Sequence, residues 1–401
     1  MTSSFSWLDF DEPARQRMRE IVELLREPGS IDELGLGRMR DAFSDRLFPG
    51  TSVLWRRARY LLFVAWTYQQ LEREGCHRRS PEDAARFVQR KVRDAIHGTK
   101  DTTGLIGART PNPMSPPDVI LWAALSTWGV REHGAGTLSQ YRSTLRAKPR
   151  RTDAEETPSS IWNPRIPPAP SRFPEEACFA LRNREAAFLQ DLILSEDAER
   201  DTDAGRRKDS LLADLLRVEH LHPVHFPWQH ELSPAASPEL REALHMSGCF
   251  SDVMHGASIL YALSLAELRT EEERADEARK AMEAWAKRIA DERPHELERW
   301  GADLDRFFLV VDAQRKTLAT EQSFVRRFSA LALRDPAALA TSADAHQLVG
   351  EREAQAKGSK ARLTSLRDDD RGDGGSIPGP LTYRWTNALN LAQDIRAGLE
   401  T

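Results

Sequence analysis

Helix start and stop signals recur along this chain of 401 residues, and they constrain its fold more than any other feature. The segment 30–33, Ser-Ile-Asp-Glu, has the spacing of a capping box, in which a serine and a later glutamate satisfy free amides of a first helical turn. The segment 80–83, Ser-Pro-Glu-Asp, adds a proline at the first helical position. Pro-Gly pairs at 28–29 and 49–50 are typical helix ends. No series of alternating apolar and polar residues stands out, so the sequence predicts an all-α fold of many helices.

Between these signals, apolar residues at helical spacing define the expected helices. In the first half we expect helices over 12–27, 30–48, 51–70, from 80 onward, 116–128 and 137–148. In the second half we expect helices over 175–194, 209–220, 238–247, 250–270, 271–291, 294–314, 316–335, 342–360 and 384–399. The stretch 250–270 is apolar nearly all round, which is typical of a central core helix. The last helix is expected to close its domain, and docking onto a partner is the alternative.

Proline and charge divide the chain into two expected helical domains joined by a Pro-rich linker. Residues 149–172 are polar and rich in proline, which indicates a partly extended linker. Residues 1–151 carry 25 Lys and Arg against 18 Asp and Glu, whereas the remaining 250 residues carry 32 against 44. We therefore expect a basic domain over 1–148 and an acidic domain over 173–401. A basic front half is suited to a polyanionic partner.

The segment 116–148 has the order of a helix-turn-helix motif: an apolar helix, a glycine turn and a second helix that starts with small polar residues. In this interpretation the second helix enters a major groove, its first turns reach base edges and its basic end meets phosphates. From Thr137 to Thr152 there is no acidic residue, which favours a polyanion. The alternative is a basic helix end that runs into a solvated linker. The residues assigned to nucleic acid here are Ser139, Gln140, Arg142, Arg146, Lys148, Arg150 and Arg151.

The segment 48–60 is a candidate for binding an anion. Thr51 and Ser52 stand at an expected helix start, where free amides and the helix dipole attract negative charge. The segment lacks the Lys-Ser/Thr ending of a phosphate-binding P-loop. The alternative is a tight helix–helix corner whose arginines pair with nearby carboxylates. Three arginines follow one to two turns later and extend the nucleic-acid candidate: Arg56, Arg57 and Arg59.

Histidine, serine and cysteine patterns give no catalytic or metal site. Four histidines crowd the segment 220–230, but their spacing matches no zinc motif, so we expect a surface loop and no metal or other cofactor. Ser251, Asp252 and His255 lie on one helical turn, where a catalytic triad with its oxyanion hole cannot form. No catalytic residue is assigned, and a role other than an enzyme is favoured.

The three cysteines are far apart and form no CxxC pair, which is typical of a reducing compartment. No apolar run approaches the roughly 18 residues that span a bilayer, and the first residues lack the basic and apolar regions of a signal peptide. We therefore expect a cytoplasmic protein without membrane contact.

Short motifs spread over the chain resemble a bacterial family of unknown function. These motifs include Ser6-Trp7-Leu8-Asp9, Asp32-Glu33-Leu34-Gly35, the segments 40–45 and 47–52 (Arg-Asp-Ala-Phe-Ser-Asp and Leu-Phe-Pro-Gly-Thr-Ser), Arg57-Ala58-Arg59-Tyr60, Met254-His255-Gly256-Ala257 and Tyr383-Arg384-Trp385. Members of that family often lie beside genes for restriction, modification or anti-phage defence. The resemblance implies a defence role by association and supplies no catalytic residue.

Charge, motifs and resemblance together predict a non-catalytic subunit, nucleic-acid-binding or scaffold, of a bacterial anti-phage defence or DNA-modification system. Its expected partners are duplex DNA and other proteins of that system. The alternative is an interaction module that recruits a helicase, methyltransferase or nuclease without touching DNA.

Overall fold

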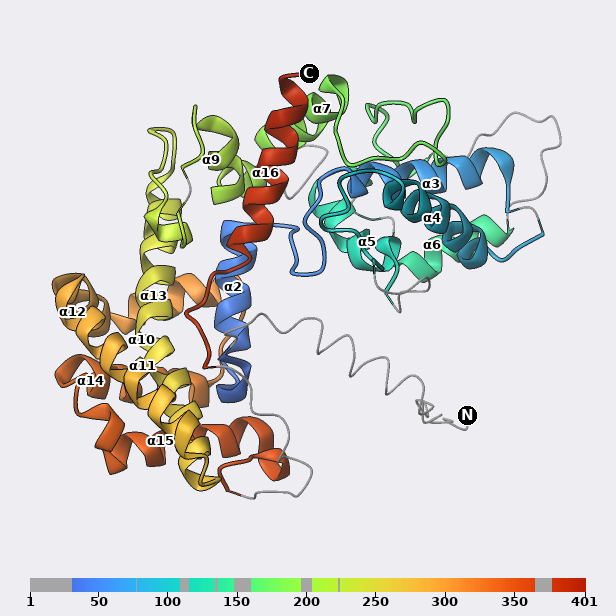
Figure 1. Cartoon of the computed structure of the whole chain (residues 1–401). Coiled ribbons are helices and arrows are strands. Elements are labelled where there is room, and N and C mark those ends of the chain that lie inside the picture. Colours follow the sequence, from blue (N-terminus) through green and yellow to red (C-terminus); the bar gives the residue numbers. More distant parts are fainter. Residues whose placement is uncertain are drawn as a thin grey trace, which may run out of the picture. The chain divides into compact units, whose positions relative to one another are not determined.

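The computed structural model describes residues 31–76, 78–108, 115–132, 134, 136–147, 160–195, 204–222, 224–364 and 377–401. Within these ranges the chain is predominantly helical and has no β-strand, only one isolated antiparallel bridge between Arg131 and Trp162 (Figure 1). The all-α class that the sequence predicts is confirmed. The expected helix over 12–27 and the predicted phosphate contacts Lys148, Arg150 and Arg151 lie outside the described residues.

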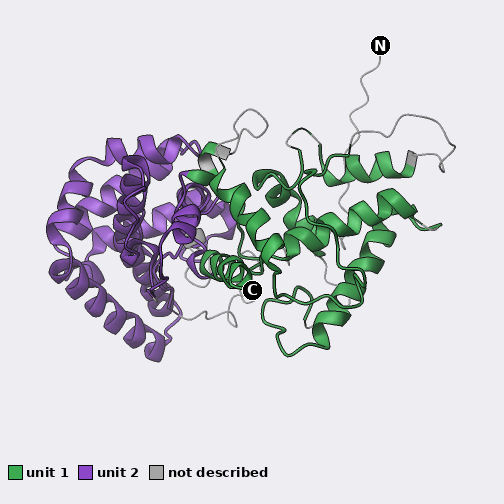
Figure 2. Ribbon diagram, turned by 90° about the horizontal axis from the view of Figure 1, so that it is seen from above, with its two compact units in different colours: residues 1–26, 50–208, 387–401 green, residues 27–49, 209–386 purple. Residues whose placement is uncertain are grey.

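The described chain divides into two compact units (Figure 2). Unit 1 contains the described parts of 50–208 and 387–401, and unit 2 contains 31–49 and 209–386. This division does not fall in the segment 149–172, because the chain on both sides of that segment belongs to unit 1. The described part of the segment packs onto unit 1 as an extended strap: Trp162 is 3% exposed, and the indole of Trp66 donates to the carbonyl of Pro167 at 2.8 Å.

Unit 1 is built around one apolar helix. Its helices are α3 (Tyr60–Glu74), α4 (Pro81–His97), α5 (Pro117–Thr127), α6 (Leu138–Ala147), α7 (Asn183–Leu194), the short α8 (Ala204–Lys208) and α16 (Trp385–Leu399) from Asn387 on. The first two turns of α3 are buried on all sides, and α4 and α5 pack against this helix. α6 in turn packs on α4 and α5, where the ring of Tyr141 stacks on Trp122 at a centroid distance of 5.3 Å.

Unit 2 surrounds a long central helix. Its elements are η1 (Ile31–Leu34), α2 (Gly37–Leu47), α9 (Leu211–Arg217), η2 (Pro227–Gln229), α10 (Pro238–Leu268), α11 (Glu272–Asp291), α12 (Pro294–Ala302), α13 (Leu304–Asp312), α14 (Ala319–Arg334), η3 (Leu339–Thr341), α15 (Ala343–Lys357) and η4 (Gly358–Lys360). α10 packs against α2, α11, α12, α14 and α15. It is long and apolar enough to cross a membrane, but 78% of its most apolar stretch is buried inside the fold. A core helix accounts for that composition.

Local signals place most helix starts correctly. The hydroxyl of Ser80 accepts the amide of Asp83 at 3.1 Å, as expected of an N-cap. The expected helix over 294–314 is interrupted, because Asp303 ends α12 and its carboxylate caps α13. Conversely, 238–247 and 250–270 form the single helix α10.

The helix expected from residue 51 begins instead at Tyr60. Gly50 adopts a positive φ of 72°, and the hydroxyl of Ser52 accepts the amide of Leu54, which makes a turn at this point. Trp55 is 1% exposed, so the segment 51–59 is a loop folded into the core of unit 1. Burial of this side chain outweighs the helical periodicity of the sequence.

Candidate functional site

Arg57, one of the arginines predicted to contact nucleic acid, is held between two carboxylates of unit 1. Its Nε donates to Asp394 Oδ2 at 3.0 Å, and one terminal nitrogen donates to Asp101 Oδ2 at 2.6 Å. Its guanidinium also lies over the ring of Phe179, 4.3 Å from the centroid. Burial alone would lower the pKa of Arg57, but the two carboxylates outweigh it and raise this pKa above its ordinary value. The charge of this residue is therefore compensated within the fold.

Arg59 is buried, with 3% of its surface exposed. It donates to Glu185 Oε1 at 2.8 Å and to the carbonyl of Cys178 at 2.8 Å. It thus ties the start of α3 to α7 and does not reach the surface. Arg56 is exposed, and its stem packs on Gly104.

Arg142, predicted to read base edges, belongs to a buried triad of side chains. Its Nε donates to the hydroxyl of Tyr68 at 3.0 Å, and a terminal nitrogen donates to Asp118 Oδ2 at 2.7 Å. Tyr68 also donates to that oxygen, at 2.6 Å. Asp118 is fully buried, so this triad joins α3, α5 and α6 through a single carboxylate. The position of Arg142 is that of a structural residue.

The exposed side of α6 keeps the polar character that the sequence predicts. Ser139, Gln140, Ser143 and Arg146 are exposed, while Tyr141 and Leu145 point into unit 1. Gln140 has a local task as well, because its Oε1 accepts the amide of Thr137 at 2.8 Å and closes a capping box.

The connection before α6 differs from that of a helix-turn-helix motif. Residues 128–137 separate α5 from α6, whereas the motif uses a turn of three or four residues. Within this connection Arg131 pairs with the strap at Trp162. Both predicted helices exist, and the connection between them is longer than that of the motif.

The anion candidate loses its physical basis in the structure. Thr51 is 5% exposed, and the amides at 51 and 52 do not begin a helix. The helix-terminus argument for Thr51 and Ser52 is thus wrong, since α3 starts at Tyr60.

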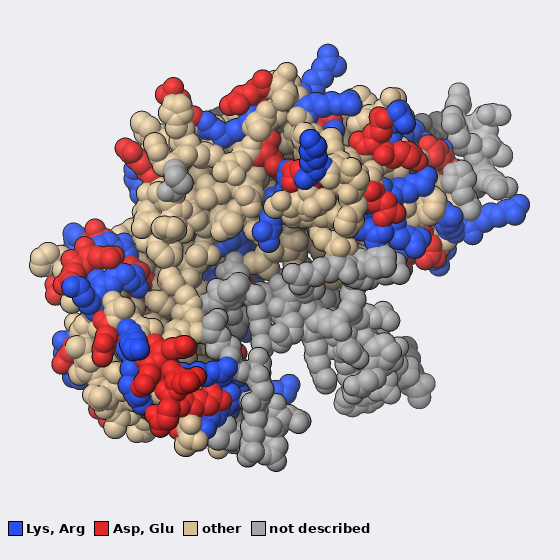
Figure 3. All heavy atoms as spheres, viewed as in Figure 1, with Lys and Arg blue, Asp and Glu red and all other residues tan. Residues whose placement is uncertain are grey.

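Charges on unit 1 are mixed. Figure 3 shows Lys and Arg interspersed with Asp and Glu over the displayed face of α3 to α6, and they do not gather in one basic area. Among the described residues predicted to bind nucleic acid, Arg57, Arg59 and Arg142 form ion pairs inside unit 1.

A concave site that sequence reasoning missed lies in unit 2, with a volume of about 600 Å³. One side of its lining comes from the segment around η2, with Phe226, Trp228 and His230. Other lining residues come from α10, from the end of α11, from the start of α12 and from the connection between these two helices: Arg241, Leu244, His245, Asp252, Arg288, Glu292, Arg293 and Glu296. The cleft thus joins the end of the histidine-rich segment 220–230 and the central helix α10.

Asp252 organises the charged side of this cleft. Arg288 and Arg293 each donate to one of its two carboxylate oxygens. A second nitrogen of Arg288 lies 3.3 Å from Nδ1 of His255, whose Nε2 lies 2.9 Å from the carbonyl of Pro378. Since a carbonyl only accepts, Nε2 carries the proton and Nδ1 accepts from the arginine. Burial lowers the pKa of His255 to about 4, so the ring is neutral at pH 7.

The histidines of the segment 220–230 do not converge on one point: among the described residues, no group of three His, Cys, Asp or Glu side chains is placed to hold a metal ion. His220, His222 and His225 are exposed. His230 is 7% exposed, and its Nε2 lies 3.4 Å from Asp214 Oδ2. Asp214 also accepts from the hydroxyl and amide of Ser233, so the cluster is a buried structural contact.

Cys249 is not an active nucleophile. It is fully buried, and its Sγ lies 3.8 Å from Nε2 of His245. Burial raises the pKa of the thiol to about 12, which keeps it protonated at neutral pH.

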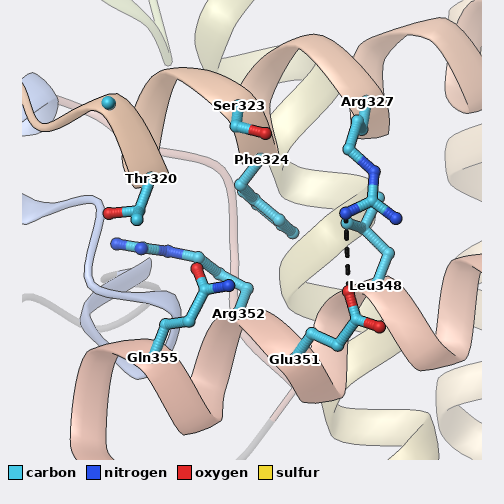
Figure 4. Close-up of a pocket in the computed structure, with 9 residues that line it drawn as sticks. Thr320, Ser323, Phe324, Arg327, Leu348, Glu351, Arg352 and Gln355 are labelled. Carbon is cyan, nitrogen blue, oxygen red and sulfur yellow. Dashed lines mark hydrogen bonds and ion pairs between the residues drawn. The ribbon is translucent and has the colours of Figure 1, made fainter.

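A smaller pocket of about 220 Å³ lies between α14 and α15 (Figure 4). Arg327 and Glu351 pair across it at 3.4 Å. Arg352 is 4% exposed and donates to the carbonyls of Leu34 and Gly35 at 2.6 and 2.9 Å. Its guanidinium is therefore used to hold η1, and the cleft beside Asp252 is the better candidate site.

Comparison with known families agrees with the motifs spread along the chain. Residues 2–396 match DUF6361, described as a family of unknown function. The chain belongs to this family. No match was found among curated proteins or among solved structures. Membership of DUF6361 covers both units and assigns no role to either.

One signal in the sequence points to the cleft. Asp252 is the only Asp, Glu, Lys or Arg between Glu242 and Glu267 of α10, and a buried carboxylate requires cationic partners. The partners themselves, Arg288 and Arg293, lie more than 30 residues later, and nothing local marks them.

Proposed function

We propose that this DUF6361 protein is a non-catalytic scaffold, a cytoplasmic interaction subunit of a bacterial anti-phage defence or DNA-modification system. The observation that carries the proposal is the outer face of α5. Val119 is 48% exposed, Ala123 is exposed and Ile120 is half-buried, and the only charged residue of α5, Asp118, is buried. An uncharged exposed helix face in a chain with 30% charged residues is suited to a protein partner with apolar side chains.

The buried triad explains why this face is presented. Asp118 points inward from α5 to Tyr68 and Arg142, and this fixes the rotation of the helix. Val119, the next residue, and Ala123, one turn later, consequently point outward. The ion pairs of Arg57, Arg59 and Arg142 connect segments of unit 1, and that of Arg142 holds α5 in the orientation that presents this face to a partner.

The test measures binding to a purified partner, with a helicase, a methyltransferase and a nuclease of bacterial defence systems as candidates. Biolayer interferometry on nuclease-treated samples compares the natural chain with Val119→Asp. Losing the burial of one valine side chain weakens binding about tenfold or more. Ser143→Asp, on the exposed face of α6, is the matched control and leaves binding unchanged. Equal binding by the two variants would reject α5 as the interface.

Direct nucleic-acid binding is the second candidate, and the exposed face of α6 favours it. Ser139, Gln140, Ser143 and Arg146 are exposed there without an acidic neighbour on the helix. Duplex DNA binding would then fall steeply between 50 and 200 mM salt, as counterion release requires. Arg146→Glu is the informative variant, because reversing Arg142 would disrupt the buried triad. Fluorescence anisotropy that shows no salt-dependent binding, or the same binding for Arg146→Glu, would exclude this candidate.

A further inference from the structure

The aromatic side of the unit 2 cleft is a fixed flat wall. The rings of Phe226 and Trp228 are parallel within 2°, with centroids 4.9 Å apart. Trp228 packs on the backbone of α10 at Gly248, where an added Cβ would lie 2.9 Å from its Cγ. The amides of His225 and Phe226 both donate to Oε1 of Gln229 at 3.1 Å, which holds the turn that carries the rings. Because the side chains of Phe226 and Trp228 are already held in place, a planar ligand ring can stack on them at little cost in their conformational entropy.

The charged side offers two neighbouring guanidinium groups, Arg288 and Arg293. Both arginines pair with the carboxylate of Asp252, Arg293 also pairs with Glu296 at 3.4 Å, and the side chains of Arg288 and Arg293 are 26% and 23% exposed. Each guanidinium has five N–H donors in a planar fork, and the contacts to Asp252, His255 and Glu296 engage only part of them. This fork matches the spacing of phosphate oxygens.

Further carboxylates limit how much negative charge the cleft accepts. Glu292 and Glu296 line it together with Arg241, so three arginines face three acidic residues over the whole lining. Carboxylates accept hydrogen bonds from sugar hydroxyls and from the amino groups of bases. They also repel additional phosphates, which disfavours triphosphates and nucleic-acid strands.

We infer that this cleft binds a nucleoside monophosphate, with the base stacked on the Phe226 wall, the phosphate at Arg288 and Arg293, and the sugar near Glu292 and Glu296. The volume of about 600 Å³ lies within the range of small-molecule sites. All lining residues belong to unit 2, so the site does not depend on the scaffold function proposed through α5 of unit 1.

The test is isothermal titration calorimetry of the full chain with AMP, GMP, CMP and UMP. At least one of them binds with a Kd between about 10 µM and 1 mM, as expected of a ligand of this size. Adenosine and inorganic phosphate serve as fragment probes, and each binds at least about tenfold more weakly than the best monophosphate. No heat from any monophosphate at millimolar concentration would overturn the inference, and so would inorganic phosphate that binds as tightly as the nucleotide.

Two variants test the two sides of the cleft separately. Arg293→Gln removes one phosphate donor and weakens binding about tenfold or more. Phe226→Leu removes the ring of the half-buried Phe226, leaves the ion-pair cluster intact and weakens binding about fivefold or more. Arg306→Gln is the matched control: Arg306 belongs to unit 2, its side chain is 52% exposed, and its pairing with Glu242 lies outside the cleft lining.

The pattern across variants decides the inference. Arg306→Gln binds the best monophosphate within about twofold of the natural chain, whereas the two cleft variants lose affinity. Circular dichroism checks that each variant is folded, and if Arg293→Gln does not fold, Phe226→Leu decides alone. Unchanged affinity in a folded Phe226→Leu variant would place the ligand elsewhere.

Discussion

Replacing Asp118 by asparagine is expected to destabilise unit 1 strongly, although the two side chains have nearly the same size and shape. The carboxylate is fully buried, and its Oδ2 accepts from Tyr68 and from Arg142. Its Oδ1 accepts the amide of Val119 at 3.0 Å. Asparagine retains one acceptor but places an NH₂ group where the second is needed, and it removes the charge that compensates Arg142.

The expected loss of unfolding free energy in Asp118→Asn follows from the burial of Arg142, which keeps its charge but loses its carboxylate partner. The side chain of Arg142 is 15% exposed, and breaking a buried ion pair on one side costs about 3–5 kcal/mol of unfolding free energy. Tyr68→Phe leaves the ion pair in place but removes the hydrogen bond donated to Asp118 and the one accepted from Arg142. A hydrogen bond to a charged group contributes about 1.5–3 kcal/mol. The double variant Asp118→Asn/Arg142→Gln removes the unpaired charge as well, so it is less destabilised than Asp118→Asn alone.

Hydrogen exchange followed by mass spectrometry measures this cost in the unit where it arises. Amides of α3, α5 and α6 lose protection in Asp118→Asn, while those of α10 and α11 in unit 2 serve as the internal control. The reasoning is refuted if Asp118→Asn costs less than about 1 kcal/mol, or if adding Arg142→Gln makes unit 1 still less stable.

Three further outcomes concern unit 2. Gly256→Ala places a Cβ 2.4 Å from Trp285 Cζ2 and is expected to lower the unfolding free energy, measured by urea denaturation, by about 1–3 kcal/mol. The Cβ of Gly350→Ala meets no atom within 4 Å, so this variant is expected to stabilise α15 by up to about 1 kcal/mol. The pKa of His255 is about 4 in the fold and about 6.5 in the unfolded chain. The stability that His255 contributes is therefore complete above pH 6.5 and is lost as the pH falls towards 4, by up to about 3 kcal/mol. The variant His255→Gln should show a shallower pH dependence of the unfolding free energy in the same urea denaturation series. Iodoacetamide at pH 8 should leave Cys249 unlabelled in the folded chain, because the thiol is buried and its pKa is raised to about 12; mass spectrometry that finds rapid labelling there would contradict this placement.

The helices were predictable because their signals are local. A cap such as Ser80 acts on an amide three residues away, and the apolar side of α4 repeats within a few turns. The two failures have different causes, one local and one tertiary. Asp303 interrupts a periodic stretch because its carboxylate caps the next helix, and the segment 51–59 has helical spacing but folds as a loop around the buried Trp55.

The candidate sites were far less predictable, because they depend on partners distant in the sequence. The count of positive charges in the front half was correct, but it carries no information on which arginines remain available. Arg57 is neutralised by Asp394, 337 residues further along the chain, and Arg59 by Glu185, 126 residues further. The cleft of unit 2 needs Asp252 and Arg293 to meet, and only the packing of α10 against the start of α12 brings them together.

By itself, the sequence determined the helical class, most helix starts and the family, since each rests on patterns within a few residues or on motifs read in order. Only the tertiary structure decided where the units divide, which arginines form ion pairs inside the fold and which surfaces are accessible to a ligand or partner. The physical reason is that a charge is neutralised by whichever carboxylate lies within a few ångströms, and the chain path that sets this distance is fixed by the burial of apolar side chains from the whole chain.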